Sequence, residues 1–359
     1  MNNSHFLDPS IKNILYGQNC RIQIDDGTFD DWSFLDQMSY VNLEEITYIF
    51  FYECKSLPIE FILSISKFIK LNEIMIDTDN CKFKELIIYF PNLERLTIGH
   101  YNLPPLKLTN SKLKYLKIYE ERKFYDVKIN KIELPDCLEE FEIEYSDNSF
   151  DIFYHNCHNL INLKKLNLIY KNEFVVHYSN LNKIKIDIEK ISLLKELEEI
   201  TFTNYLPENF VEIINFLPKV KCLNINHMKN IFYPQGDIKL SEINKINSLK
   251  IIFDKSTIHE KFFFPYLPEN IEYLKVCLYN VNSMHSKINM DNLPFELKEL
   301  RITCKDIPIL NNLPIGLKNI YIKYLPYFCQ KINTLEIIKE KIKEKIKIPL
   351  NCEVYIDVE

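Results

Sequence analysis

The stretch NLPFELKELRITCKDI, residues 292–307, decides the fold because its pattern recurs along most of the chain. YLPENIEYLKVCLYNV at 266–281 and NLPIGLKNIYIKYL at 312–325 share that pattern. Each has a Leu-Pro pair, an apolar residue three places after the proline, and two more apolar residues three and five places after that one. Such recurrence across 359 residues favours a fold that grows by repetition.

The repeated unit is an L-x-x-L-x-L motif in which any apolar residue can occupy the three positions. Twelve matches follow one another at steps of 20 to 34 residues, with a mean of about 25. This period is the one expected of leucine-rich repeats. The matches begin at Leu43, Leu71, Leu93, Leu113, Leu138, Leu163, Leu197, Val220, Leu249, Ile271, Leu297 and Leu317, and the one at Leu249 is imperfect.

The spacing within the motif predicts a short strand. Offsets three and five place two apolar side chains on the same face of a strand, and the leading residue turns inward before the strand begins. One such unit cannot bury its apolar face alone, so neighbours stack in parallel. The longer intervals carry helix-like patterns, such as IEFILSISKFIK at 59–70 and ENFVEIINF at 208–216. We therefore predict an α/β leucine-rich repeat solenoid, a curved horseshoe with a parallel inner sheet and irregular short helices and turns on its convex side.

Proline precedes the leading residue by three places at Pro135, Pro268, Pro294 and Pro314. Because proline fixes φ and lacks an N–H donor, it suits the corner where the chain enters the strand. The resulting LPxxLxxLxI units, from residue 43 to about 325, resemble the FNIP-type repeats of amoebae and of the giant viruses that infect them. The resemblance implies a leucine-rich, protein-binding repeat protein of amoebal or giant-virus origin.

The two ends of the chain depart from the repeat. We expect an N-terminal cap over 1–42, with a strand at CRIQID and a helix at FDDWSFLDQM, a solenoid over 43–325, and a C-terminal helix-strand cap over 326–359. In the last segment, one helical stripe ends before Pro349, and it carries Leu335, Ile338, Ile342 and Ile346. The alternative for this lysine-rich helix is that it lies on a membrane or in a partner's groove.

Composition excludes several classes of function. The five glycines are scattered, so no phosphate-binding loop is available, and the net charge of −6 does not attract nucleic acid. We find no secretory signal and no stretch of eighteen apolar residues, which argues against a membrane span. The ten cysteines are scattered singly, with no C-x-x-C pair. We expect reduced thiols in a cytoplasmic monomer, in the host cytoplasm if the protein is viral.

The solenoid geometry predicts where a partner binds. Offsets two and four from each leading residue point out of the inner sheet and form two rows on the concave surface. For the repeats at Leu43 and Leu249, these offsets are occupied by Glu45 with Thr47 and by Ile251 with Phe253. Tyrosine and arginine are favoured at interface hot spots. The residues that we expect to contact a protein partner are Tyr115, Lys117, Tyr119, Glu140, Glu142, Glu144, Tyr273, Lys275, Arg301 and Tyr321.

Candidate chemical sites are weak by comparison. YHNCHNL at 154–160 gathers His155, Cys157 and His158, but three zinc ligands within four positions cannot easily wrap one tetrahedral ion. The carboxylates of IDDGTFDD at 24–31 lack the spacing of a calcium loop. No nucleophile elbow, zinc-protease or kinase motif is present. We expect no metal, no cofactor and no enzymatic activity.

Two function classes remain besides a protein-binding scaffold. LPIEFILSISKFI at 57–69 resembles the opening of an F-box, which would make the chain a substrate adaptor for ubiquitin ligation. It lies, however, where the solenoid already requires a convex helix. Nucleic-acid binding by the basic later repeats is the third possibility, and the acidic balance of the chain opposes it. We expect a non-catalytic scaffold that holds a protein partner on the concave sheet.

Overall fold

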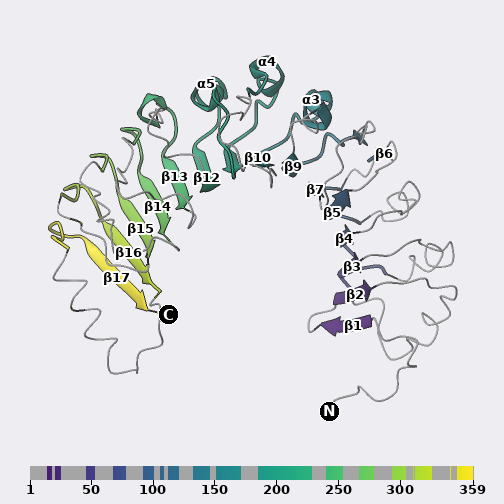
Figure 1. Ribbon diagram of the computed structural model, residues 1–359, viewed down its shortest axis with the longest axis horizontal. Coiled ribbons are helices and arrows are strands. Elements are labelled where there is room, and N and C mark those ends of the chain that lie inside the picture. The colour runs from purple at the N-terminus through teal and green to yellow at the C-terminus, as the bar shows by residue number, and fades with distance from the viewer. Residues whose placement is uncertain are drawn as a thin grey trace, which may run out of the picture. The chain divides into compact units, whose positions relative to one another are not determined.

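The computed structural model describes residues 14–17, 21–25, 46–52, 68–77, 92–100, 106–108, 112–120, 132–145, 151–170, 185–228, 240–253, 267–278, 293–304, 310, 312–325, 340 and 346–358 (Figure 1). Contacts within the chain divide it into two compact units. Unit 1 is Met1–Lys164 with Leu193–Glu196, and unit 2 is Lys165–Ser192 with Leu197–Glu359.

Unit 1 contains one parallel ladder of strands in the order β1-β2-β3-β4-β5-β7-β9, in which only the β1–β2 pair is antiparallel. Strands β6 and β8 form a separate parallel pair. The elements are β1 (Ile14–Gly17), β2 (Arg21–Asp25), β3 (Tyr48–Tyr52), β4 (Glu73–Asp77), β5 (Arg95–His100), β6 (Leu106–Lys107), β7 (Tyr115–Glu120), β8 (Ile132–Glu133), β9 (Glu140–Tyr145) and α3 (Asp151–Asn156).

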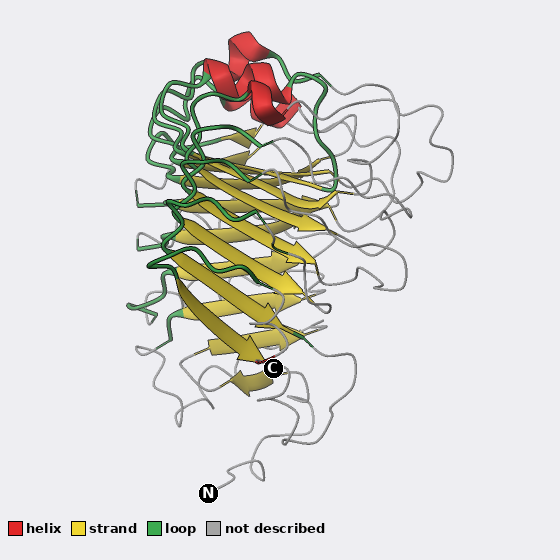
Figure 2. Cartoon of the chain, turned by 90° about the vertical axis from the view of Figure 1, so that its left-hand side faces the viewer, coloured by secondary structure: helices red, strands yellow, loops and turns green. Residues whose placement is uncertain are grey.

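Unit 2 continues the same design with strands that are all parallel and pair in chain order (Figure 2). Helices α4 and α5 lie side by side in this unit (Figure 1). The elements are β10 (Lys165–Tyr170), α4 (Ile188–Ile191), β11 (Glu199–Thr203), α5 (Phe210–Phe216), β12 (Cys222–Met228), η6 (Leu240–Glu242), β13 (Ser248–Phe253), β14 (Tyr273–Leu278), β15 (Glu299–Cys304), β16 (Asn319–Tyr324) and β17 (Glu353–Val358).

The apolar triplet of each motif forms the core, as the spacing predicts. In the repeat that opens the sequence analysis, Leu297, Leu300 and Ile302 are at most 1% exposed. Cross-strand register places Leu300 between Leu274 and Ile320, so each triplet stacks on the triplets of its neighbours. Each unit is therefore an α/β leucine-rich repeat solenoid, because no single triplet could bury itself without its neighbours.

The register corrects two of the twelve motif assignments. Tyr48 pairs with Glu73, so the first motif of unit 1 begins at Ile46 and not at Leu43. Leu249 pairs with Leu223 and Leu274 at the middle apolar position, so its motif begins at Ile246 and reads INSLKI without imperfection. The errors have a related cause: three residues out of step, apolar residues satisfy the whole pattern from Leu43 and its first two positions from Leu249.

The corners of unit 2 explain the Leu-Pro pairs. The Ile271 N–H donates to the Pro268 carbonyl at 3.4 Å, and Leu297 and Leu317 donate in the same way to Pro294 and Pro314 at 3.2 and 3.1 Å. Proline thus occupies the first position of a turn whose fourth residue leads the motif. It can occupy this position without losing a hydrogen bond, because the turn needs only its carbonyl.

Other expectations have mixed outcomes. Helix α5 confirms the pattern at 208–216, and β2 and β17 confirm strands at CRIQID and EVYIDV. Ile346 forms a parallel bridge with Leu310, so its assignment to a helical stripe is wrong. Leu335, Ile338, Ile342, the helix predicted at FDDWSFLDQM and nearly all of the segment 57–69 lie outside the described residues. Within the described part of the chain, no helix has the length and apolar character needed to cross a membrane.

Candidate binding face

The strands of each unit present a face that carries polar and aromatic side chains, named here the polar face. It consists of the second and fourth residues after each leading residue, together with Tyr119 and Glu144 at the sixth position in unit 1. In unit 2 the sixth residues Ile252, Cys277 and Thr303 are buried and do not belong to it. Strand β7 shows the alternation: Leu116 and Ile118 are buried, whereas Tyr115, Lys117 and Tyr119 between them are partly exposed. The polar face follows from the period of two in a strand.

In unit 1 the register brings opposite charges together across neighbouring strands. Lys117 lies directly opposite Glu142, and its Nζ is 2.5 Å from the Glu142 Oε1. The Arg95 guanidinium carbon lies 3.9 Å from the centroid of the Tyr115 ring, and the Arg95 Nε lies 3.8 Å from Glu73 Oε1. The Arg95 guanidinium is therefore held between the Tyr115 ring and the Glu73 carboxylate, and this contact links side chains of β4, β5 and β7.

Tyr115 is the electrostatic centre of this cluster. Burial of its phenol, together with the negative charge of Glu142, raises its pKa to about 12, while Arg95 acts in the opposite direction. Burial has this effect because it disfavours the charged phenolate. Tyr115 therefore remains a neutral hydrogen-bonding group at physiological pH.

The structure assembles most of the residues expected in unit 1. Tyr115 stands directly opposite Glu140, beside the Lys117–Glu142 pair. Tyr119 lies opposite Gly99 on β5. Glu144 continues the row on β9. Because Lys117 neutralises Glu142, the surface is less acidic than the sequence alone indicates.

In unit 2 the expected residues Tyr273, Lys275, Arg301 and Tyr321 lie on three consecutive strands, β14 to β16. The Arg301 guanidinium carbon is 4.8 Å from the Tyr321 ring centroid, and Arg301 Nε donates to Glu299 Oε1 at 2.5 Å. The Tyr321 ring stacks on Tyr355 with centroids 4.8 Å apart and planes 9° apart. Arginine and two tyrosines therefore form one continuous stack over β15, β16 and β17.

Sequence reasoning missed three members of the polar face in unit 2, Ser248, Lys250 and Tyr355. Lys250 takes the fourth position on β13, where the misassigned motif had placed Phe253, and the second position belongs to Ser248 instead of Ile251. Tyr355 was missed because the C-terminal strand was treated only as a cap. The signals were present as INSLKI and as the alternating VYI at 354–356. In unit 1 the same three-residue shift had assigned Glu45 and Thr47 to the second and fourth positions, which Tyr48 and Phe50 occupy.

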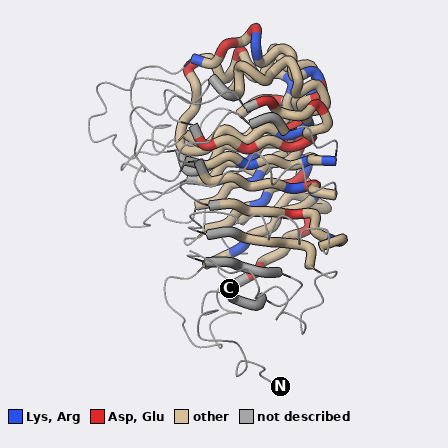
Figure 3. Tube along the Cα trace, turned by 90° about the vertical axis from the view of Figure 1, so that its right-hand side faces the viewer, with Lys and Arg blue, Asp and Glu red and all other residues tan. Residues whose placement is uncertain are grey.

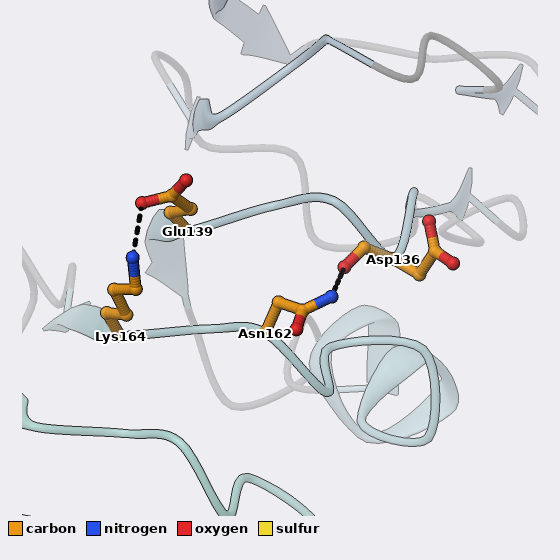
Figure 4. Close-up of polar contacts among 4 residues, drawn as sticks. All are labelled: Asp136, Glu139, Asn162 and Lys164. Carbon is orange, nitrogen blue, oxygen red and sulfur yellow. Dashed lines mark hydrogen bonds and ion pairs between the residues drawn. The ribbon is translucent and has the colours of Figure 1, made fainter.

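Asparagine side chains join successive repeats away from the polar face. Asn162 Nδ2 donates to the Asp136 carbonyl at 2.9 Å, next to the ion pair of Lys164 with Glu139 at 2.8 Å (Figure 4). Asn92 and Asn270 stand at the same place before their leading residues and donate to carbonyls of the preceding repeat. This regularity holds the corners in register and so keeps the polar face aligned.

Deeper asparagines link the segments on the other side of the core. Asn156 is 1% exposed, and its Oδ1 accepts a hydrogen bond from the Leu134 N–H at 2.8 Å. In unit 2, Asn209 both accepts from the Ile186 N–H and donates to the Ile186 carbonyl, at 3.1 and 2.8 Å. Each amide replaces water for backbone groups that the irregular segments would otherwise bury unpaired.

The candidate zinc ligands do not converge. Cys157 is buried and its Sγ donates to the Phe153 carbonyl, whereas His155 and His158 are exposed and their ring centroids are 6.4 Å apart. In the ranges that the structure describes, no three His, Cys, Asp or Glu side chains gather as metal ligands would. A hollow in unit 2 lies at the corners and not on the polar face, lined by Leu267, Glu269, Pro294 and Phe295 among others.

Acidic and basic residues are interspersed along the strands and turns of the described parts (Figure 3). No protein-family model matches the chain, and no curated protein does either. A chain in the structure of the Drosophila Toll–Spatzle complex, a hub in development and innate immunity, is similar with a TM-score of 0.35 and 12% identity. The similarity covers 96% of this chain and 56% of that one, so the present chain spans little more than half of its length.

Proposed function

We propose that the chain is a non-catalytic scaffold that holds a protein partner on its polar face. One observation carries the proposal: tyrosines of the polar face are held in place by cations, Tyr115 by Arg95 and Tyr321 by Arg301. Side chains that are already ordered lose little conformational entropy on binding. Tyrosine and arginine also supply large contact areas with polar tips, as interface hot spots do.

The acidic pairs support the non-catalytic part of the proposal. A general acid at neutral pH needs a raised pKa, but the hydrogen bond from Lys164 lowers the pKa of Glu139. The adjacent Glu140 belongs to the polar face, on the other side of the strand from Glu139. The two carboxyl groups therefore make a poor acid–base couple.

The finer identity of the repeats is also a proposal. We infer FNIP-type repeats in an amoebal or giant-virus protein from the LPxxLxxLxI units, and the corner turns at Pro268, Pro294 and Pro314 support this assignment. The described cysteines are thiols that form no disulfide, and Cys157 and Cys304 among them are buried in the core, which fits a reducing compartment. We infer a cytoplasmic location on these grounds.

The test compares two variants of the polar face, one in each unit. Tyr115→Ala with Glu142→Ala changes unit 1, and Tyr273→Ala with Arg301→Ala changes unit 2. A matched control carries Ile161→Ala and Ile315→Ala, which are exposed apolar residues at the corners. All proteins are first shown to melt alike and are then used for affinity capture and for direct binding to each purified partner.

We expect at least one polar-face variant to lose a partner that the control keeps. The variant that loses it identifies the unit that binds. If both polar-face variants retain every partner, with affinities equal to that of the wild type, the proposal is wrong.

A further inference from the structure

Three cations stand in direct register on the polar face of unit 2. Lys250 on β13 pairs with Lys275 on β14, and Lys275 pairs with Arg301 on β15. Neighbouring strands are about 4.8 Å apart, and like charges directly opposite one another destabilise a sheet. A run of three such residues therefore destabilises the sheet. Its presence is better explained by a role in binding than by a role in folding.

The carboxylates near this run are engaged by other residues. Glu299 accepts from Arg301 Nε, Glu353 accepts from the Tyr355 hydroxyl, and Glu199 accepts from Asn224. Within the described ranges, Lys250 and Lys275 have neither an ion pair nor a side-chain hydrogen bond. Elsewhere the chain pairs its strand lysines, as Lys117 with Glu142 shows.

The aromatic stack extends the cationic run. Tyr321 and Tyr355 follow Arg301 at the same fourth position on the next two strands, and Tyr273 is 46% exposed beside Lys275. Arg301 donates only its Nε–H to Glu299, so its terminal guanidinium nitrogens can donate to a ligand. The surface thus offers three cations spanning about 10 Å and then a rigid aromatic platform.

We propose that the Lys250–Lys275–Arg301 run, with the Tyr321–Tyr355 stack, binds an acidic, tyrosine-containing or otherwise aromatic segment of a protein partner. The two lysines without an ion pair, together with the terminal guanidinium nitrogens of Arg301, complement an anionic segment. The carboxylates of Glu299 and Glu353 within the same face repel a continuous polyanion such as nucleic acid, whereas a peptide places its few carboxylates where the cations are. This inference rests on the proposed function and names the chemistry of the partner.

The probe is a fluorescein-labelled peptide that repeats Glu-Glu-Tyr, compared with a Gln-Gln-Tyr peptide and a labelled single-stranded oligothymidine. Anisotropy is measured at low salt, about 50 mM, to limit screening. The variant is Lys250→Gln with Lys275→Gln. The matched control, Lys221→Gln with Lys318→Gln, also removes two positive charges, but from exposed positions outside the polar face.

We expect the Glu-containing peptide to bind wild type and control alike, and to bind the variant at least about tenfold more weakly. Little binding of the Gln-containing peptide is expected. Equal binding by variant and control overturns the inference, as does absence of binding to the wild type. Tighter binding of the oligothymidine than of the acidic peptide would overturn it in favour of a nucleic-acid surface. A negative result with these probes would not change the result of the affinity capture, so the peptide proposal can be wrong while the proposed function is right.

A second measurement needs no ligand. Lys275→Gln removes the middle charge and should raise the melting temperature, because it relieves two like-charge contacts, whereas Lys318→Gln should leave it nearly unchanged. A lower melting temperature for Lys275→Gln than for the wild type would contradict the view that this run is costly to the fold.

Discussion

The pKa of Tyr115 on the polar face differs from that of a tyrosine on an ordinary exposed surface. Tyr115 lies beneath the Arg95 guanidinium and beside the negative charge of Glu142, and its phenol is partly desolvated. Desolvation and the carboxylates oppose ionisation, and the arginine favours it. Because the first two effects exceed the third, the pKa rises to about 12.

This balance predicts how stability depends on alkaline pH. An unfolded tyrosine ionises at about pH 10, whereas Tyr115 in the folded protein retains its proton to about pH 12. The resulting stabilisation is complete below pH 10 and is lost as the pH rises through 12. We expect Tyr115→Phe to reduce the fall in melting temperature between these two pH values.

Ultraviolet difference titration of wild type against Tyr115→Phe gives the midpoint for this residue alone. Glu142→Gln provides the control, since removing a charge that raises the pKa should lower the midpoint. A Tyr115 midpoint near 10, the value of a free tyrosine, would contradict the burial of the phenol.

At the scale of the element, the repeat consists of a corner turn, a strand and a return segment, and asparagine joins it to its neighbour. The corner asparagines Asn92, Asn162 and Asn270 are exposed and donate one hydrogen bond each. Asn209 differs because both ends of its amide engage the backbone of Ile186 from a partly buried position. An amide is required there, since the site needs one donor and one acceptor.

Asn209→Asp keeps the size of the side chain and replaces the donor by an oxygen that faces the Ile186 carbonyl. We expect a loss of about 1–3 kcal/mol in the free energy of unfolding, measured with urea, because a buried carbonyl loses its donor and faces a negative charge. Asn270→Asp is the matched control at an exposed corner, and water should limit its cost. Equal losses for both variants would show that Asn209 is no more than another corner contact.

The strands were easier to predict from the sequence than the side-chain contacts between them. The period of two within a strand and the step of about 25 residues between motifs identify the strands, because buried triplets such as Leu297, Leu300 and Ile302 cannot be replaced by polar residues. The motifs that begin at Ile46 and Ile246 were assigned three residues out of step, because apolar residues also fill all or most of the pattern in the shifted position. The stacking of Tyr355 on Tyr321 was out of reach, since it depends on which strands become neighbours.

At the scale of the whole molecule, stability is distributed along the chain. Within unit 2 the described strands pair in chain order, and the main-chain hydrogen bonds follow this order: the Asn247 carbonyl accepts from both Glu272 and Tyr273, and the Glu272 carbonyl accepts from Lys298 and Glu299. A fold of this kind is approximately a sum of repeat and interface terms. A local defect should therefore remain local.

Leu300→Ala tests this expectation inside unit 2. Leu300 is fully buried between Leu274 and Ile320, so the substitution should cost about 2–5 kcal/mol. Ile315→Ala, at an 82% exposed corner position, should cost less than about 0.5 kcal/mol. In hydrogen exchange, we expect Leu300→Ala to accelerate exchange in β14, β15 and β16 far more than in β10, because the defect acts on adjacent interfaces. Uniform acceleration across β10 to β17 would instead mean that unit 2 opens in one step, and that its repeats do not respond as nearest neighbours.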